Sequence, residues 1–177
     1  LYAKPLQNLD IEKGLSVLDY ILEWIGQFKV IDEIVLGISE GDENLAFVEL
    51  AKRKKLSYII GNEDDVLGRL VQCGEKGNAT DVFRVTTESP FTYFEAIEPA
   101  WEKHVSGNYD FTCLDHVPDG SGFEIVRLET LTYAHDHGEK KHRSEFCSLY
   151  IRENAKHFNI QQIEPPPEVK RTDIRLT

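Results

Sequence analysis

Short apolar runs alternate with amphipathic segments along the first part of the chain, and this alternation constrains the fold more than any other feature. The runs are rich in β-branched side chains, as is typical of strands covered on both faces, whereas the amphipathic segments repeat their apolar positions at the helical period. This order predicts right-handed crossovers and a Rossmann-like α/β fold, with a mainly parallel sheet and flanking helices. The predicted strands are 33–38, 57–60 and 81–85, and the predicted helices are 15–27, 42–55, 64–76 and 93–105.

The regular alternation of strand and helix patterns ends after residue 105. Residues 110–131 are predicted to form a strand, a Pro/Gly turn and a second strand, followed by a helix at 140–154 and a strand at 158–164. We interpret 106–157 as an excursion from the sheet. Because 177 residues with 41% apolar content are enough for one core, the whole chain is predicted to be a single domain.

The charge balance argues against a nucleic-acid scaffold. The net charge is -11 and the basic residues are scattered, whereas a phosphate backbone is held by grouped Lys and Arg. No run approaches the roughly 18 apolar residues of a membrane-spanning helix, and no leader precedes the fold. Cys73, Cys113 and Cys147 form no C-x-x-C pair, which predicts buried thiols in a reducing compartment. We therefore expect a cytoplasmic protein without a nucleic-acid or membrane partner.

The sequence gives little support for a zinc site, a hydrolase triad or a glycine-rich phosphate loop. His135, His137 and His142 lie in "HDHGEKKHR", which matches no zinc spacing and is interpreted as a solvated loop between helices. No serine-acid pair has a partnered histidine, so a hydrolase triad is not indicated. The chain also lacks the glycine-rich phosphate loops of P-loop NTPases and dinucleotide oxidoreductases.

Six motifs, in order, resemble the cytidylyltransferases that activate acidic sugars. They are "VIDEIVLGISEGDEN", "GNEDDVLGRL", "DVFRVTTESPF", "PDGSGFEIV", "HRSEFCSLYIRENAKHFNI" and "RTDIRLT". The branch that the chain resembles most is the spore-coat polysaccharide synthesis F type, related to the acylneuraminate and ketodeoxyoctonate cytidylyltransferases. The resemblance covers nearly the whole chain and implies a domain of the nucleotide-diphosphosugar transferase type.

The resemblance implies a specific reaction. The anomeric hydroxyl of a sugar acid attacks the α-phosphorus of CTP, pyrophosphate leaves, and a CMP-sugar forms for surface polysaccharide synthesis. Magnesium is the implied cofactor, and it would let an acidic protein hold an anionic triphosphate. The family also implies a homodimer formed through the excursion, which would contribute to sugar binding as well.

The segment after the predicted strand 81–85 carries the implied metal ligand. Where the family has Gly-Asp, a variable residue and Pro, this chain has Thr87, Glu88, Ser89 and Pro90. Glu88 is therefore the candidate magnesium ligand and a candidate catalytic residue, although it replaces an aspartate and Thr87 replaces a glycine. The alternative is an exposed carboxylate at a loop entrance. Arg84 and Thr86 match nucleotide-binding positions of the same motif.

Four further residues are assigned to the nucleotide. Lys4 matches the lysine of a family motif that binds the triphosphate, and it is the second candidate catalytic residue. Ser39 ends a predicted strand where the family places a small hydroxyl. Asp65 and Arg69 lie four apart on one helical face in the segment that resembles the nucleotide-recognising one. The alternative for this pair is a helix N-cap acid and its surface salt-bridge partner.

The sugar side is assigned to three residues. Glu124 follows the Pro-Asp-Gly turn, and Arg143 and Glu145 lie in the motif where the family has Arg-Glu-His. Glu145 replaces the histidine, so the acceptor specificity of the family is not expected to be inherited intact. A dimer is further predicted from apolar residues that a small domain would struggle to cover alone. They are Phe123, Ile125, Leu128 and Leu131.

The ends of the chain carry two further expectations. The resemblance implies a strand before Leu1, and an aspartate within two residues of Thr177 that completes the metal site. Two alternatives to the cytidylyltransferase hypothesis remain open: a degenerate member that binds nucleotide or serves as an assembly domain without turnover, and a nucleotidyltransferase that uses another NTP.

Overall fold

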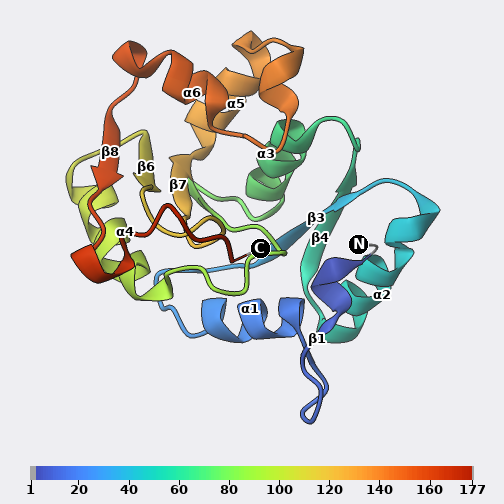
Figure 1. The fold of residues 1–177 in the computed structure, drawn as a ribbon. Helices are drawn as coiled ribbons and strands as arrows, with labels where there is room; N and C mark the ends of the chain where they lie inside the picture. Colours follow the sequence, from blue (N-terminus) through green and yellow to red (C-terminus); the bar gives the residue numbers. More distant parts are fainter. Residues whose placement is uncertain (1–2, 177) are drawn as a thin grey trace. The chain divides into compact units, whose positions relative to one another are not determined.

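The computed structural model describes residues 3–176, which form a mixed α/β structure (Figure 1). The described chain divides into two compact units, and each is described by itself. That the whole chain is a single domain stays a prediction. Unit 1 comprises residues 3–32, 83–125 and 161–176, and unit 2 comprises residues 33–82 and 126–160.

The elements follow one another as strands and helices with short 3₁₀ turns between them. The strands are β1 Asn8–Asp10, β2 Leu15–Ser16, β3 Val35–Ser39, β4 Ser57–Gly61, β5 Asp81–Arg84, β6 Phe111–Leu114, β7 Glu124–Arg127 and β8 Ile160–Ile163. The α-helices are α1 Val17–Ile25, α2 Leu45–Lys54, α3 Val66–Lys76, α4 Ile97–Ser106, α5 Leu128–His137 and α6 Leu149–Glu153. The 3₁₀ turns are η1 Lys4–Leu6, η2 Asp42–Asn44, η3 Phe94–Ala96, η4 Lys140–Arg143, η5 Ala155–His157 and η6 Pro167–Val169.

Unit 2 is built on the parallel pair β3 and β4. The pairing runs from Val35 opposite Ser57 to Ser39 opposite Gly61. Helix α3 packs against both strands and against α5, and it buries Leu67 completely. Because parallel strands end at the same edge of a sheet, Ser39 and the turn after Gly61 lie together at the carboxyl edge.

Unit 1 contains the antiparallel pair β1 and β2 and the helix α1. Ser16 caps this helix: its hydroxyl accepts a hydrogen bond from the Asp19 N–H, and the Asp19 carboxylate accepts one from the Ser16 N–H. The predicted helix 15–27 therefore begins two residues later than expected. Leu18 and Ile21 on its apolar face are almost fully buried.

The four-stranded sheet has the order β5-β7-β6-β8, and all four residues of β6 are buried.

Two predictions for the later part of the chain are wrong. The second strand predicted within 110–131 ends at Arg127, and α5 begins at Leu128, because Leu131 and Ala134 then recur at helical spacing on a buried face. The single helix predicted at 140–154 is instead the 3₁₀ turn η4, a loop, and the short helix α6.

The residues offered as evidence for a dimer lie inside the protein. Phe123, Ile125 and Leu131 are at most 3% exposed, and the Leu128 side chain lies against Gly74 of α3. These residues are covered within the chain and do not support self-association, so the homodimer stays a prediction. The three cysteines are buried thiols outside any disulfide, as expected. Within residues 3–176, no helix combines the length and the apolar character needed to cross a membrane.

Candidate functional site

Lys4 and Glu88 form an ion pair in unit 1, although they are far apart in the sequence. The Lys4 Nζ lies 3.7 Å from the Glu88 Oε2, with side chains 29% and 55% exposed. Pro5, the second residue of η1, is buried and anchors the turn that carries Lys4. The structure thus brings together the two residues predicted to be catalytic, as a lysine beside a carboxylate that solvent and a ligand can reach.

The loop that carries Glu88 is fixed by short hydrogen bonds. The Thr86 and Ser89 hydroxyls lie 2.6 Å apart, and the buried Thr92 hydroxyl donates to the Ser89 carbonyl over 3.1 Å. Thr87 has no left-handed backbone conformation, so the position where the family has glycine does not need one here. The replacement of that glycine is therefore compatible with this loop.

Arg84 and Glu124 pair with each other at the ends of β5 and β7. The Arg84 guanidinium lies 3.2 Å from the Glu124 Oε2, and both side chains are mostly buried, at 22% and 12% exposed. Arg84 was predicted to contact nucleotide and Glu124 sugar. Their roles stay predictions, and the geometry adds that each neutralises the other's charge.

Ser39 lies at the carboxyl edge of β3 in unit 2. Its hydroxyl oxygen is buried and has no hydrogen-bond partner among the residues that the structure describes. The next residue, Glu40, accepts a hydrogen bond of 3.0 Å from the Asn62 side chain, and its N–H donates to the Gly61 carbonyl. This edge therefore presents a polar side chain with unused hydrogen-bonding capacity, as expected for a ligand-facing position.

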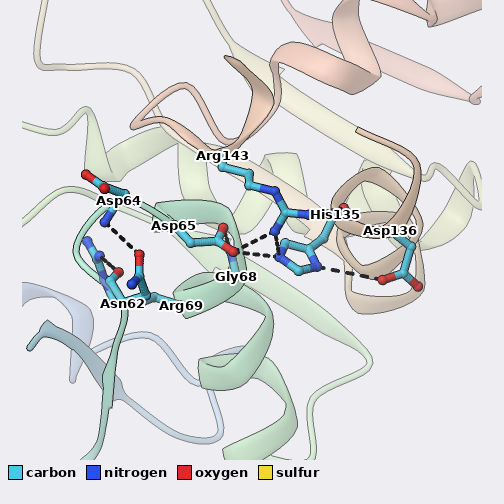
Figure 2. A network of polar contacts seen from close by, with 8 residues as sticks. All are labelled: Asn62, Asp64, Asp65, Gly68, Arg69, His135, Asp136 and Arg143. Carbon is cyan, nitrogen blue, oxygen red and sulfur yellow. Dashed lines mark hydrogen bonds and ion pairs between the residues drawn. The ribbon is translucent and has the colours of Figure 1, made fainter. Parts of the chain in front are cut away.

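Asp65 is the centre of a polar network at the start of α3 (Figure 2). Its Oδ1 accepts the Gly68 N–H at 2.8 Å, which makes it the N-cap. Its Oδ2 accepts a hydrogen bond from Arg143 at 2.6 Å and lies 2.8 Å from the His135 Nε2. Burial by itself would raise the pKa of Asp65, but the hydrogen bonds, led by that from His135, lower it below the ordinary value.

Arg69 does not pair with Asp65, so the N-cap interpretation was right about the acid and wrong about its partner. The Arg69 guanidinium donates to the carbonyls of Asn62 and Glu63. Its aliphatic stem crosses Gly61, where an added Cβ would lie 2.7 Å from the Arg69 Cγ. Arg69 therefore holds the turn between β4 and α3. Nucleotide contact by Asp65 or Arg69 stays a prediction.

The histidine-rich segment is not the solvated loop that was expected. His135 and His137 belong to α5, and His142 is 4% exposed. The His142 Nδ1 accepts the Glu139 N–H, and its Nε2 lies 2.9 Å from the Glu153 carboxylate. The helical recurrence of apolar residues from 128 onward was the signal that could have placed His135 on a helix.

Arg143 and Glu145, both predicted to bind the sugar, have different surroundings in the structure. Arg143 ends the turn η4 and is engaged by Asp65, and its NH2 donates to the His135 carbonyl. Glu145 follows two residues later and is exposed. Sugar binding by either residue stays a prediction, and the observed work of Arg143 is to tie η4 to α3 and α5.

The described residues fit a magnesium ion only as a partner of bound phosphate. Among residues 3–176 there is no group of three His, Cys, Asp or Glu side chains that could hold a metal by themselves. Glu88 offers one exposed carboxylate beside a lysine. Magnesium in nucleotide sites is commonly held by one or two carboxylates and the phosphate oxygens, so this donor set fits that arrangement and not a dedicated protein cage.

Solved structures of low sequence identity share this fold. A cytidylyltransferase from Leptospira borgpetersenii serovar Hardjo-bovis superposes with a TM-score of 0.81 at 20% identity, covering 92% of this chain and 69% of that one. CMP:2-keto-3-deoxy-manno-octonic acid synthetase, solved with CTP, gives a TM-score of 0.71 at 13% identity, covering 93% and 84%. This chain has the cytidylyltransferase fold. The predicted Rossmann-like class of the nucleotide-diphosphosugar transferase type is thereby confirmed.

Two proteins are similar in sequence to this chain over nearly its whole length. The uncharacterized protein MJ1063 of Methanocaldococcus jannaschii is 29% identical over 99% of this chain and 73% of its own length. The spore coat polysaccharide biosynthesis protein SpsF of Bacillus subtilis is 23% identical over 100% of this chain and 75% of its own length. No protein-family profile matches the chain. The resemblance to cytidylyltransferases inferred from the motifs is confirmed by SpsF together with the two solved structures.

Proposed function

We propose that the protein is a nucleotidyltransferase that transfers CMP from CTP to a sugar or sugar acid, releasing pyrophosphate, for the synthesis of a surface polysaccharide or glycan. The observation that carries the proposal is the Lys4–Glu88 pair at 3.7 Å. A cation and a carboxylate meet there, at positions that match the triphosphate and metal ligands of the resembled family. The CTP-bound synthetase of the same fold supports the choice of nucleotide.

The chain's own residues supply charge and position. In the step, the sugar hydroxyl oxygen forms a bond to the α-phosphorus, the bond to the bridging oxygen breaks, pyrophosphate leaves, and the hydroxyl proton passes to solvent. Lys4 is a mobile point charge suited to the phosphate oxygens. Its present partner Glu88 must release it when a triphosphate arrives, which frees the carboxylate for a hard cation.

Magnesium, when bound, would neutralise charge on the triphosphate and polarise the α-phosphate. Glu88 would hold it from the protein side. The replacement of aspartate by glutamate lengthens the side chain by one methylene, and the exposed loop position leaves room for that longer reach.

A pyrophosphate-release assay with four NTPs and a panel of sugars tests the proposal. We expect CTP to support turnover with magnesium, and Lys4→Gln or Glu88→Gln to lower kcat/KM by about 100-fold or more. Because Glu88 is 55% exposed, its Gln variant should melt at the parent temperature, and Glu88→Asp should retain activity.

The matched control is an equivalent surface pair elsewhere. Lys52 and Glu49 pair at 2.9 Å on α2 with side chains 56% and 71% exposed, so Lys52→Gln and Glu49→Gln remove the same groups without touching the site. Parent-like turnover in Glu88→Gln would overturn the role of the pair. Equal shifts in melting temperature with all four NTPs would indicate that the protein binds the phosphates without recognising the base, and would contradict the proposed use of CTP.

A further inference from the structure

Unit 1 contains a cavity of about 400 Å³ that none of the assigned residues lines. Its walls come from α1, the segment 90–95, the segment 117–121 and the segment 168–176. The volume lies within the range of small-molecule sites, which are typically mostly apolar with a few converging polar groups. The segment 90–95 begins two residues after Glu88, so the cavity adjoins the loop that carries the proposed metal ligand.

One wall of the cavity is aromatic and held rigidly. The Trp24 and Phe94 rings stack with centroids 5.4 Å apart and planes within 4°, and Tyr20 meets Trp24 edge-on at 6.4 Å. Phe94 is 4% exposed, whereas Phe91 is 48% exposed and free to contact a ligand. Fixed aromatic faces of this kind suit a ligand that presents a face of C–H groups.

The same cavity contains hydroxyls that can bind a ligand. Ser121 is 5% exposed, and no group among the described residues hydrogen-bonds its hydroxyl. Its backbone carbonyl accepts the Tyr93 N–H at 2.9 Å, which fixes both residues on the cavity wall. The Ser121 hydroxyl oxygen is not sealed off from the cavity, where it can donate a hydrogen bond to a ligand hydroxyl or accept one from it.

The charged groups at the cavity favour a ligand without negative charge. Glu95 and Glu168 both line it. Among the described residues that line the cavity, Arg171 is the one cation, and it is bound by both carboxylate oxygens of Asp173, at 2.8 and 2.9 Å. A carboxylate on the ligand would therefore meet two acidic side chains and an arginine that is already neutralised.

We propose that this cavity is the acceptor subsite and that it binds an uncharged pyranose ring, with its C–H face on the aromatic wall and its hydroxyls on Ser121 and the two glutamates. Neutral sugars are then preferred over sugar acids. Glu95 and Glu168 set this preference, and Phe91 contributes to the binding of the ring. The identification as an acceptor subsite rests on the proposed nucleotidyl transfer, whereas the binding of the ring does not.

Tryptophan fluorescence gives a direct readout of binding. The chain has two tryptophans, and Trp101→Phe leaves Trp24 at the cavity as the only one. In this background we would titrate glucose, galactose and mannose, each against its uronic acid, without nucleotide. We expect a saturable change with at least one neutral sugar, and binding of its uronate that is weaker by roughly fivefold or more.

Matched variants locate the binding. Phe91→Ala should weaken it about three- to tenfold, whereas Phe146→Ala removes an aromatic ring that is 66% exposed and lies outside the cavity, and should leave it unchanged. The double variant Glu95→Gln/Glu168→Gln should bring the uronate close to the neutral sugar. The control double variant replaces exposed glutamates of α4 that do not line the cavity, as Glu98→Gln/Glu102→Gln.

The outcomes separate this inference from the proposed function. No saturable response to any neutral sugar, a tighter response to the uronates, or an equal loss in Phe91→Ala and Phe146→Ala would overturn the subsite. CTP-specific melting shifts without sugar binding would overturn the subsite alone. Sugar binding at the cavity without any nucleotide response would retain the binding site and overturn the proposed transferase.

Discussion

The two oxygens of Asp65 have separate partners, and this separation gives a sharp test of the network at the start of α3. The Oδ1 caps the helix through the Gly68 N–H, and the Oδ2 faces Arg143 and His135. Asp65→Asn can keep the cap, because asparagine caps as well as aspartate, but it places an NH₂ group against two nitrogens. Asp65→Ala removes both functions.

The expected losses in the free energy of unfolding follow from the burial and the charge of Asp65 and its partner. Asp65 and Arg143 have side chains 23% and 33% exposed, so their charge-assisted hydrogen bond is partly shielded from water. Its loss in Asp65→Asn should lower the free energy of unfolding by about 1.5–3 kcal/mol. Asp65→Ala should cost about 1 kcal/mol more, for the lost cap.

Urea unfolding at pH 7 measures both variants, with Asp64→Asn as the control. Asp64 is adjacent and exposed, and its loss should change the free energy of unfolding by no more than about 0.5 kcal/mol. If Asp65→Asn is as stable as the parent while Asp65→Ala loses only the cap, the ion pair contributes nothing and the reasoning fails.

The same pair should depend on pH in a defined direction. The pKa of Asp65 is lowered in the folded protein from its ordinary 3.8. A lowered carboxyl pKa contributes stability that is complete above 3.8 and is lost as the pH falls through the folded value. The stability gap between the parent and Asp65→Asn should therefore be full at pH 7 and shrink below pH 4 or so. A gap that widens in acid would contradict this assignment.

Three further predictions concern packing, reactivity and backbone strain. Gly122→Ala should destabilise by about 1–3 kcal/mol in urea unfolding, since its Cβ would lie 2.7 Å from the Leu114 carbonyl oxygen, whereas Gly77→Ala, with a nearest contact of 3.5 Å, should be tolerated. Burial raises the pKa of Cys73 to about 11, so alkylation of this thiol at pH 8 should be slow until the protein is unfolded; fast labelling of the native protein would contradict this. Ala3 has φ 50°, in the left-handed region that favours glycine, so Ala3→Gly should raise stability by up to about 1 kcal/mol, and a clear loss would show that the turn is unstrained.

Local signals accounted for much of the fold. The strands at β3, β4 and β5 and the helices α3 and α4 were predicted to within a few residues, because each is encoded by its own apolar period. The prediction failed where a strand ran directly into a helix at Leu128, since no turn residue separates the two periods there. It failed again at 140–154, where polar residues dominate and periodicity carries little information.

The candidate site was predictable only through resemblance. Nothing in the local sequence of Lys4 points to Glu88; each was assigned to the site only because it matches a position of one family, and their ion pair was not predicted. The ion-pair partner of Asp65 was not predicted: the alternative interpretation paired it with the nearby Arg69, but its partner is Arg143. The cavity walls come from four separate segments, so no sequence window contains them.

The sequence by itself determined the alternating elements and the α/β class, because apolar periodicity acts within a few residues of chain. Only the tertiary structure decided which charge faces which, as with Arg143 on Asp65, and which apolar residues are covered, as with Phe123. The physical reason is one of magnitude. A single ion pair contributes about 1–3 kcal/mol, which is too little to direct the folding of the chain, so charged partners are selected by the packing of the elements that carry them.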